Sequence, residues 1–109
     1  MRNNRERLLD IEEAIENIKK YSVKGRRTFE KEELVQNWII HHLQIIGEAA
    51  AKISDDFQQQ HPDIPWLKII GMRNILVHDY FRIDVNAVWS VVENDIPQLE
   101  QQIESFLKE

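Results

Sequence analysis

Four polar side chains within eight positions have the types and the spacing to act on a phosphate. Arg73, Asn74, His78 and Tyr80 stand in the largely apolar segment GMRNILVHDYF, residues 71–81. Arginine presents a planar, permanently charged fork that matches phosphate, and histidine titrates near neutral pH and acts as a general acid or base. Without a metal, this pair suits cleavage of an RNA phosphodiester by its own 2′-hydroxyl, because the guanidinium offsets the charge that develops on the phosphate. A helix would also bring the Asn74 amide beside the His78 imidazole, since the two residues are four apart.

The spacing alone does not decide for catalysis. An arginine followed five positions later by a histidine arises easily by chance in a chain with four histidines. A structural interpretation therefore stands beside the catalytic one. In it, Arg73 pairs with a carboxylate of the preceding helix, and His78 is a half-buried, hydrogen-bonded side chain.

The composition excludes several other chemistries. The 109 residues include no cysteine, which rules out a disulfide framework and a thiolate metal site. The net charge of -5 argues against a protein that coats nucleic acid with a broad basic surface. His41 and His42 are adjacent and diverge around a helix, and His61 falls in a polar segment. We expect surface or packing roles for these three histidines, and neither a metal site nor a cofactor.

The apolar pattern predicts the helices that position these residues. Apolar residues recur at helical spacing through most of the chain, and only three glycines and three prolines interrupt it. The predicted helices cover residues 3–22, 28–57, 66–81 and 85–109. The segment SDDFQQQHPDIP, with two prolines, is predicted to be a loop. Asp84 is predicted to cap the last helix, and Pro97 to kink or divide it. The result is an all-α antiparallel bundle of four to five helices in a single domain, residues 1–109.

Two negative features bear on the compartment. The N-terminal residues lack the uninterrupted apolar core of a signal peptide, and no apolar run approaches the ~20 residues that span a bilayer. Together with the absence of cysteine, these features lead us to expect a cytoplasmic protein with no membrane partner.

Several blocks of the sequence resemble one known family. RNILVHDY matches the R-x4-H-x-Y motif of the HEPN superfamily, specifically the HepT-like toxins. LQIIGEAAAKIS is similar to the second helix of that family, and IPWLKIIGMRNILVHDYFRID to its third helix and following turn. VWSVVENDIPQL is similar to its last helix, whereas the first ~25 residues are generic.

The resemblance implies a specific function. HepT-like proteins are HEPN bundles that form homodimers, with two copies of the motif beside a shared cleft, and they act as metal-independent ribonucleases. They are the toxin half of a toxin–antitoxin pair, whose antitoxin is a minimal nucleotidyltransferase that transfers AMP to the motif tyrosine. By this resemblance Arg73 and His78 are the catalytic pair and Tyr80 is the site of AMPylation. Asn74 occupies the polar position that follows the motif arginine in many members.

Helical geometry agrees with a dimeric site. Arg73 and His78 lie about 140° apart around an ideal helix, at ~100° per residue, so one subunit does not easily focus both on one phosphate. A two-fold dimer can do so, because each motif supplies one side of the cleft. Glu48, in the segment IIGEAA, is predicted to orient Arg73 or another side chain of the site, with a purely structural ion pair as the equal alternative.

Two further functions stay open at this point. One is a non-catalytic helical module that partners a nucleotidyltransferase and presents nucleotide or substrate. The other is a structural helical dimer with an inert polar helix. Trp38, Trp66 and Trp89 are expected to anchor the core or the dimer, with stacking of an RNA base on Trp66 as a less favoured alternative. The basic segment KGRR is interpreted as a solvated turn, with contact to RNA or antitoxin as the alternative.

Overall fold

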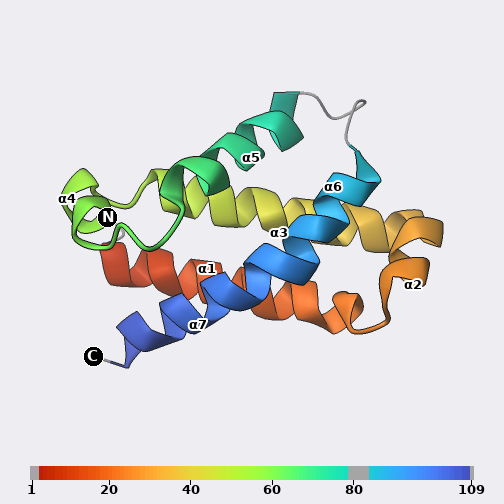
Figure 1. Ribbon diagram of the computed structural model, residues 1–109, viewed down its shortest axis with the longest axis horizontal. Coiled ribbons are helices and arrows are strands. Elements are labelled where there is room, and N and C mark those ends of the chain that lie inside the picture. Colours follow the sequence, from red (N-terminus) through yellow and green to blue (C-terminus); the bar gives the residue numbers. More distant parts are fainter. Residues whose placement is uncertain (1–2, 79–83, 109) are drawn as a thin grey trace.

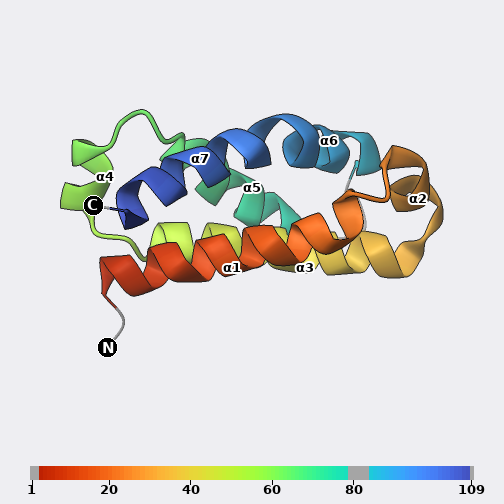
Figure 2. The ribbon, with the colours of Figure 1, turned by 90° about the horizontal axis from the view of Figure 1, so that it is seen from below.

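Helices α1 (Asn4–Ser22) and α3 (Glu33–Ala51) lie side by side and antiparallel in a helical bundle (Figure 1). The computed structural model describes residues 3–78 and 84–108, apart from the side chains of residues 75, 77 and 78. Every regular element in these two ranges is helical, which confirms the predicted all-α class. Figure 2 shows the C-terminal helices stacked on the layer that α1 and α3 form.

The first helix follows its prediction closely. Asn3 caps α1 by accepting a hydrogen bond from the backbone N–H of Glu6 at 2.9 Å. The predicted apolar stripe of α1 is buried in the core, and it consists of Leu8, Ile11, Ile15 and Ile18. Burial of such a stripe is what holds an amphipathic helix on its neighbours.

The predicted helix over residues 28–57 is wrong as one element, because the chain breaks at Glu32. Helix α2 (Arg26–Lys31) ends there, and Glu32 is extended before α3 begins. The Gln36 side chain donates to the backbone carbonyl of Phe29 at 2.8 Å and satisfies the end of α2. The break turns Phe29 into the core, where its ring centroid lies 5.3 Å from that of Trp89.

The same predicted helix also ends earlier than expected, and part of the predicted loop is helical. Helix α4 (Asp55–Gln60) lies within the SDDFQQQHPDIP segment. Ser54 caps it by accepting from the backbone N–H of Phe57 at 3.3 Å. Asn4 of α1 accepts from the backbone N–H of Ser54 at 3.1 Å, so the start of α4 is tied to the start of α1.

Helix α5 (Trp66–His78) lies along one edge of the molecule and packs mainly against α3 (Figure 1). This confirms the start of the predicted helix over residues 66–81. Its predicted end, and with it Tyr80, lies outside the described residues.

The C-terminal segment is divided as its proline predicts. Asp84 caps α6 (Val85–Ser90) through the backbone N–H of Asn86 at 2.9 Å, which confirms the predicted cap. A π-helical turn (Val91–Asp95) follows, and α7 (Ile96–Leu107) carries Pro97 in its first turn. Because proline has no N–H for the carbonyl four residues back, the helix cannot continue regularly through this point.

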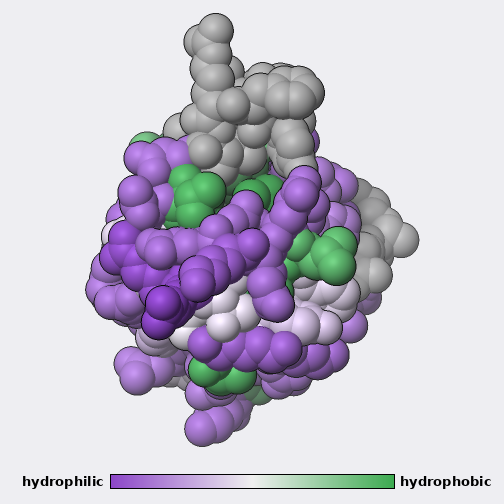
Figure 3. Space-filling view, turned by 90° about the vertical axis from the view of Figure 1, so that its right-hand side faces the viewer, coloured by the Kyte–Doolittle hydropathy of each residue, from purple (hydrophilic) through white to green (hydrophobic). Residues whose placement is uncertain are grey.

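One end of the molecule has a mostly polar surface. At the end of the molecule that contains α2, a mainly hydrophilic face is interrupted by separate hydrophobic patches (Figure 3). Leu34, in the first turn of α3, is 84% exposed. None of the helices in the described ranges is long and apolar enough to cross a bilayer.

Candidate active site

Helices α3 and α5 touch at Gly47 and Arg73. A Cβ atom added to Gly47 would overlap the Cβ of Arg73 and would lie 2.8 Å from its Cγ and 3.3 Å from its Cα. No larger residue fits at position 47 unless one helix moves. The glycine therefore allows the backbone of α5 to pack close to α3. This close packing determines the position of the Arg73 Cα and Cβ atoms.

Two polar neighbours hold the Arg73 guanidinium. Nη2 lies 3.9 Å from Oε1 of Glu48, and Nη1 donates to Oδ1 of Asn74 at 3.1 Å. The Nε–H of Arg73 is buried without a hydrogen-bond partner among the described atoms. Both side chains of the Arg73–Glu48 pair are partly exposed, so the Arg73 side chain remains partly accessible to solvent although its first carbon atoms lie against α3.

The pairing of Glu48 with Arg73 is one that the sequence predicts. Its contribution to stability is small, because partly exposed ion pairs contribute about 0–1 kcal/mol. The geometry fits both the orienting role of Glu48 and a structural ion pair, and the orienting role stays a prediction.

His78 is the last residue of α5. The end of the helix is supported from α3, where Gln44 donates to the backbone carbonyl of Leu76 at 3.2 Å. Arg73 and His78 share one continuous helix, so the register that separates them by about 140° holds in the structure. The side chain of His78 and the whole of Tyr80 lie outside the described residues.

Gly47 is the residue that the sequence reasoning missed. Its signal was present, because a glycine inside a strongly predicted helix costs up to about 1 kcal/mol relative to alanine and needs a packing or functional reason. The sequence could not say which residue lies opposite, because the contact joins positions 26 residues apart.

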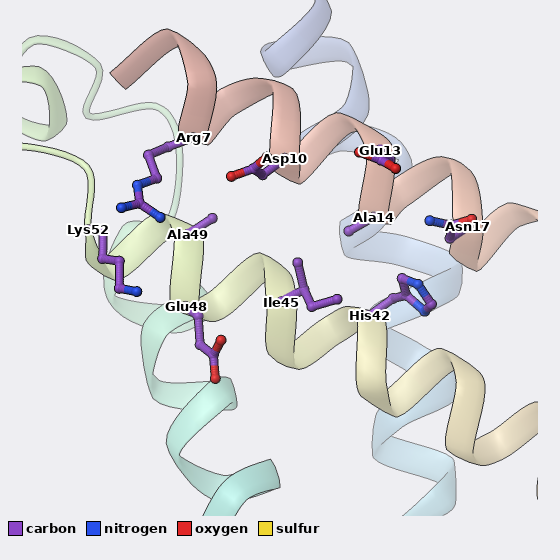
Figure 4. Close-up of a pocket in the computed structure, with 10 residues that line it drawn as sticks. All are labelled: Arg7, Asp10, Glu13, Ala14, Asn17, His42, Ile45, Glu48, Ala49 and Lys52. Atoms are coloured by element: carbon purple, nitrogen blue, oxygen red, sulfur yellow. The ribbon is translucent and has the colours of Figure 1, made fainter. Parts of the chain in front are cut away.

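A groove of about 340 Å³ lies between α1 and α3 (Figure 4). Arg7 and Lys52 lie toward one end of it, and Asn17 and His42 toward the other. Glu48 lines the groove and also contacts Arg73, so this one carboxylate is shared between the groove and the candidate site.

His42 has a packing role, as expected. It is 7% exposed, and its Nδ1 lies 2.8 Å from the carbonyl oxygen of Trp38. Because a carbonyl only accepts, Nδ1 carries the proton. Within residues 3–78 and 84–108, no group of three histidine, aspartate or glutamate side chains is arranged to hold a metal ion.

The tryptophans lie in or against the core, as expected. Trp66 and Trp89 are buried, and Trp38 packs against the core from its edge. The Trp66 indole donates to the backbone carbonyl of His61 at 3.0 Å. With its ring buried, Trp66 offers no face on which an RNA base could stack.

Two of the three cations in the basic KGRR segment, Lys24 and Arg26, already have partners within the chain. Arg26 pairs with Glu30 at 2.8 Å and donates to the Asn86 side chain at 2.7 Å. The Lys24 ammonium lies 5.1 Å from the ring centroid of Tyr21. These contacts favour the interpretation as a structural turn.

Comparison with known proteins decides the family. The model of the family described as ribonuclease HepT-like matches residues 11–106. The chain belongs to this family. The match covers the whole of α5, so Arg73 and His78 lie inside the HepT-like region. The predicted enzyme class, a ribonuclease, is thereby confirmed at the level of the family.

Relatives match between 70% and 98% of the HepT-like chain. The "Probable ribonuclease HepT" of Thermococcus cleftensis is 39% identical over 108 residues, which are 98% of each chain. A "Putative RNase" of Caldanaerobacter subterraneus subsp. tengcongensis is 33% identical over 101 residues, 93% of this chain and 88% of the relative. Another, of Methanocaldococcus jannaschii, is 38% identical over 76 residues, 70% of each chain. No solved structure matches the chain.

Proposed function

We propose that the chain is a metal-independent endoribonuclease and the toxin of a toxin–antitoxin pair, with Arg73 and His78 as its catalytic residues. One observation carries the proposal. The R-x4-H pair stands on α5 of a chain in the HepT-like family, and its arginine packs against α3 and stays partly exposed. Relatives that are named as ribonucleases support the reaction class.

The reaction needs one proton acceptor and one fixed positive charge. His78 takes the proton of the RNA 2′-hydroxyl, the 2′-oxygen forms a bond to phosphorus, and the bond from phosphorus to the 5′-oxygen breaks. The leaving 5′-oxygen takes a proton from water or from a second imidazolium. The products are a 2′,3′-cyclic phosphate and a 5′-hydroxyl, and Arg73 offsets the charge on the phosphate as it develops.

The active form in this proposal is a homodimer. Because Arg73 and His78 diverge around α5, a second copy of the chain supplies the side of the cleft that one copy lacks. Asn74 and Glu48 act as positioning residues, since each contacts the Arg73 guanidinium.

Regulation in this proposal acts on Tyr80, two residues beyond His78. A minimal nucleotidyltransferase antitoxin would join the tyrosine oxygen to the α-phosphorus of ATP, with loss of the phenolic proton and release of pyrophosphate. The attached AMP adds bulk and negative charge beside a site that binds phosphate, and it therefore excludes RNA.

Cleavage of RNA by the purified protein in excess EDTA tests the catalytic part. We expect products with cyclic phosphate ends, and loss of cleavage in Arg73→Ala and His78→Ala. Arg27→Ala and His41→Ala, which remove exposed side chains of the same types from other helices, should cleave as the wild type does. Unchanged cleavage by His78→Ala, or dependence of cleavage on a divalent metal, would contradict the proposed mechanism.

Mass spectrometry tests the regulatory part. Incubation with a nucleotidyltransferase partner and ATP should add AMP to wild type and not to Tyr80→Phe, and the modified protein should not cleave RNA. If the unmodified protein accepts AMP but never cleaves RNA, the alternative of a non-catalytic binding module replaces the nuclease.

A further inference from the structure

Two cationic side chains line one end of the groove between α1 and α3. Arg7 extends from α1 toward α3, and Lys52 stands at the C-terminal end of α3 (Figure 4). Neither forms an ion pair with another residue in the two described ranges. The Nε–H of Arg7 is also buried with no hydrogen-bond partner among the described atoms. Because a buried donor without an acceptor is costly, this end of the groove favours a ligand that accepts hydrogen bonds.

This end of the groove adjoins the candidate active site. Arg73 is the second arginine in the described part of the chain whose Nε–H is buried without a partner. Glu48 lines the groove and lies 3.9 Å from the Arg73 guanidinium, so its negative charge is already paired. Lys52 follows Glu48 by four residues, which is about 6 Å along α3. A single RNA strand bound at Arg73 can therefore also reach Arg7 and Lys52.

Charge indicates which ligand fits. The fork of an arginine matches a phosphate, and the ammonium of a lysine adds a point charge beside it. Asp10 and Glu13 line the α1 side of the groove beyond Arg7. A polyanion that followed the whole groove would meet these carboxylates, whereas one that crossed only the Arg7–Lys52 end would meet two cations. The groove therefore suits a single phosphate at this end and not a strand along its length.

We propose that Arg7 and Lys52 form a second phosphate site, which binds a backbone phosphate of RNA a few nucleotides from the scissile phosphate at Arg73. The inference rests on the proposed function and adds a binding site to it. Contacts to the backbone carry no sequence information, so this site increases affinity for any RNA long enough to reach it. Since the same contact is made before and during the reaction, it lowers KM and does not raise kcat.

The salt dependence of RNA binding tests this site. The probe is a non-cleavable 2′-O-methyl oligonucleotide of about twelve nucleotides. Each phosphate of a single strand that a protein neutralises contributes about 0.7 to the slope of log K against log salt. The double variant Arg7→Gln/Lys52→Gln should therefore lower the slope by about 0.7 and weaken binding about fivefold at ~0.1 M salt.

A second double variant provides a matched control. Arg5→Gln/Lys31→Gln changes the net charge by the same amount, and it removes exposed cations from α1 and from the end of α2. At 100° per residue, Arg5 lies on the side of α1 opposite Arg7. The control should keep the wild-type slope. Lys52→Gln alone alters an exposed side chain and should lower the slope in the same direction, so the test holds if Arg7→Gln unfolds the protein.

The length of the substrate gives a second measurement. A dinucleoside monophosphate contains only the scissile phosphate, whereas the longer RNA also contains the phosphate that the second site binds. Wild type should have a lower KM for an RNA of about twelve nucleotides than for the dinucleoside monophosphate. In Arg7→Gln/Lys52→Gln this advantage should shrink about fivefold, with the change in KM and not in kcat.

The outcomes separate this inference from the proposed function. If both double variants reduce the slope and the affinity equally, the effect is one of net charge, and the second site is wrong while the nuclease proposal stands. A fall in kcat without a rise in KM would also overturn the inference, because the residues would then act on the chemical step. If wild type cleaves neither substrate but Arg7→Gln/Lys52→Gln still lowers the slope and the control does not, the nuclease proposal fails and the phosphate site stands.

Discussion

Gly47 of α3 lies directly against Arg73 of α5, so closely that even a methyl group at position 47 would overlap the arginine side chain. This packing contact matters for the candidate active site, because it determines the position of the Arg73 side chain relative to α3. Glu48, the next residue along α3, then reaches the same guanidinium at 3.9 Å.

Gly47→Ala should destabilise the protein and impair cleavage together. Overpacking costs about 1–3 kcal/mol, which exceeds the ~1 kcal/mol that alanine gains over glycine in a helix. Urea unfolding and single-turnover cleavage measure the two effects. The control for Gly47→Ala is Gly71→Ala. It adds the same methyl group at a position where no atom lies within 4 Å of the added Cβ. This control variant should show no loss of stability. Equal stability of Gly47→Ala and wild type would show that the contact does not constrain the helices.

Glu48→Gln should separate positioning from stability. The pair with Arg73 is partly exposed, so we expect the free energy of unfolding to change by less than about 1 kcal/mol. Cleavage should nevertheless fall, by up to about 10²-fold, if the carboxylate holds the guanidinium in place. The fall should appear in kcat more than in KM, and Glu48→Asp should restore part of it. Full activity of Glu48→Gln would contradict the positioning role and would show that the ion pair with Arg73 is only structural.

Trp66→Ala should act on the fold and not on RNA recognition. The side chain is buried and its indole donates to His61, so its loss should lower the free energy of unfolding by about 3–5 kcal/mol. Trp66→Phe preserves most of the packing and should bind RNA with wild-type affinity in a filter-binding assay. If this folded variant binds RNA much more weakly than wild type, the alternative that an RNA base stacks on Trp66 is supported instead.

The contact between α1 and α7 should weaken at high pH. Lys19 donates to Glu100 at 3.0 Å, and this hydrogen bond, followed by the attraction between the two charges, raises the pKa of Lys19 above its ordinary value of 10.5. The stabilisation is therefore complete below pH 10.5 and is lost as the pH rises through the folded-state pKa. Because Lys19 is about half exposed, the contribution is at most about 1 kcal/mol.

Urea unfolding from pH 7 to 11.5 measures this effect. Lys19→Met should lower stability at neutral pH and should converge with wild type at the alkaline end. Lys19→Arg keeps its charge throughout and should lose less stability than wild type above pH 10.5. If wild type and Lys19→Met differ by the same amount at every pH, the charge of Lys19 makes no contribution.

Features that depend only on neighbouring residues, such as apolar spacing, helix caps and prolines, could be predicted from the sequence. The stripe from Leu8 to Ile18 predicts α1, and Asp84 and Pro97 predict the start and the division of the C-terminal helices. The break at Glu32 was missed because it depends on burying Phe29 against Trp89, a contact between residues 60 apart. Helix α4 was missed for a similar reason. Phe57 packs against Trp66 and Phe106, and those contacts stabilise a short helix that its polar sequence does not indicate.

The candidate site also has parts that the sequence predicts and parts that depend on contacts between distant residues. The motif residues could be predicted, because residue type and spacing suffice for them. Arg73 was one of the partners predicted for Glu48, since a carboxylate among apolar helix positions is expected to have one. The role of Gly47 could not be predicted, because it depends on which residue lies opposite the backbone in space. A glycine inside a helical pattern indicates that something packs closely there, but it does not indicate which residue that is.

Mixing two inactive variants tests the central claim, that two subunits bring Arg73 and His78 together around one RNA phosphate. Arg73→Ala and His78→Ala homodimers should each be inactive, and exchange of subunits between them should form heterodimers with one intact composite site. With random exchange, half the dimers are mixed and each has one of its two sites intact, so activity should return to about a quarter of wild type. If the mixture stays inactive although sedimentation shows that subunits have exchanged, each site draws both residues from one chain, and the account is contradicted.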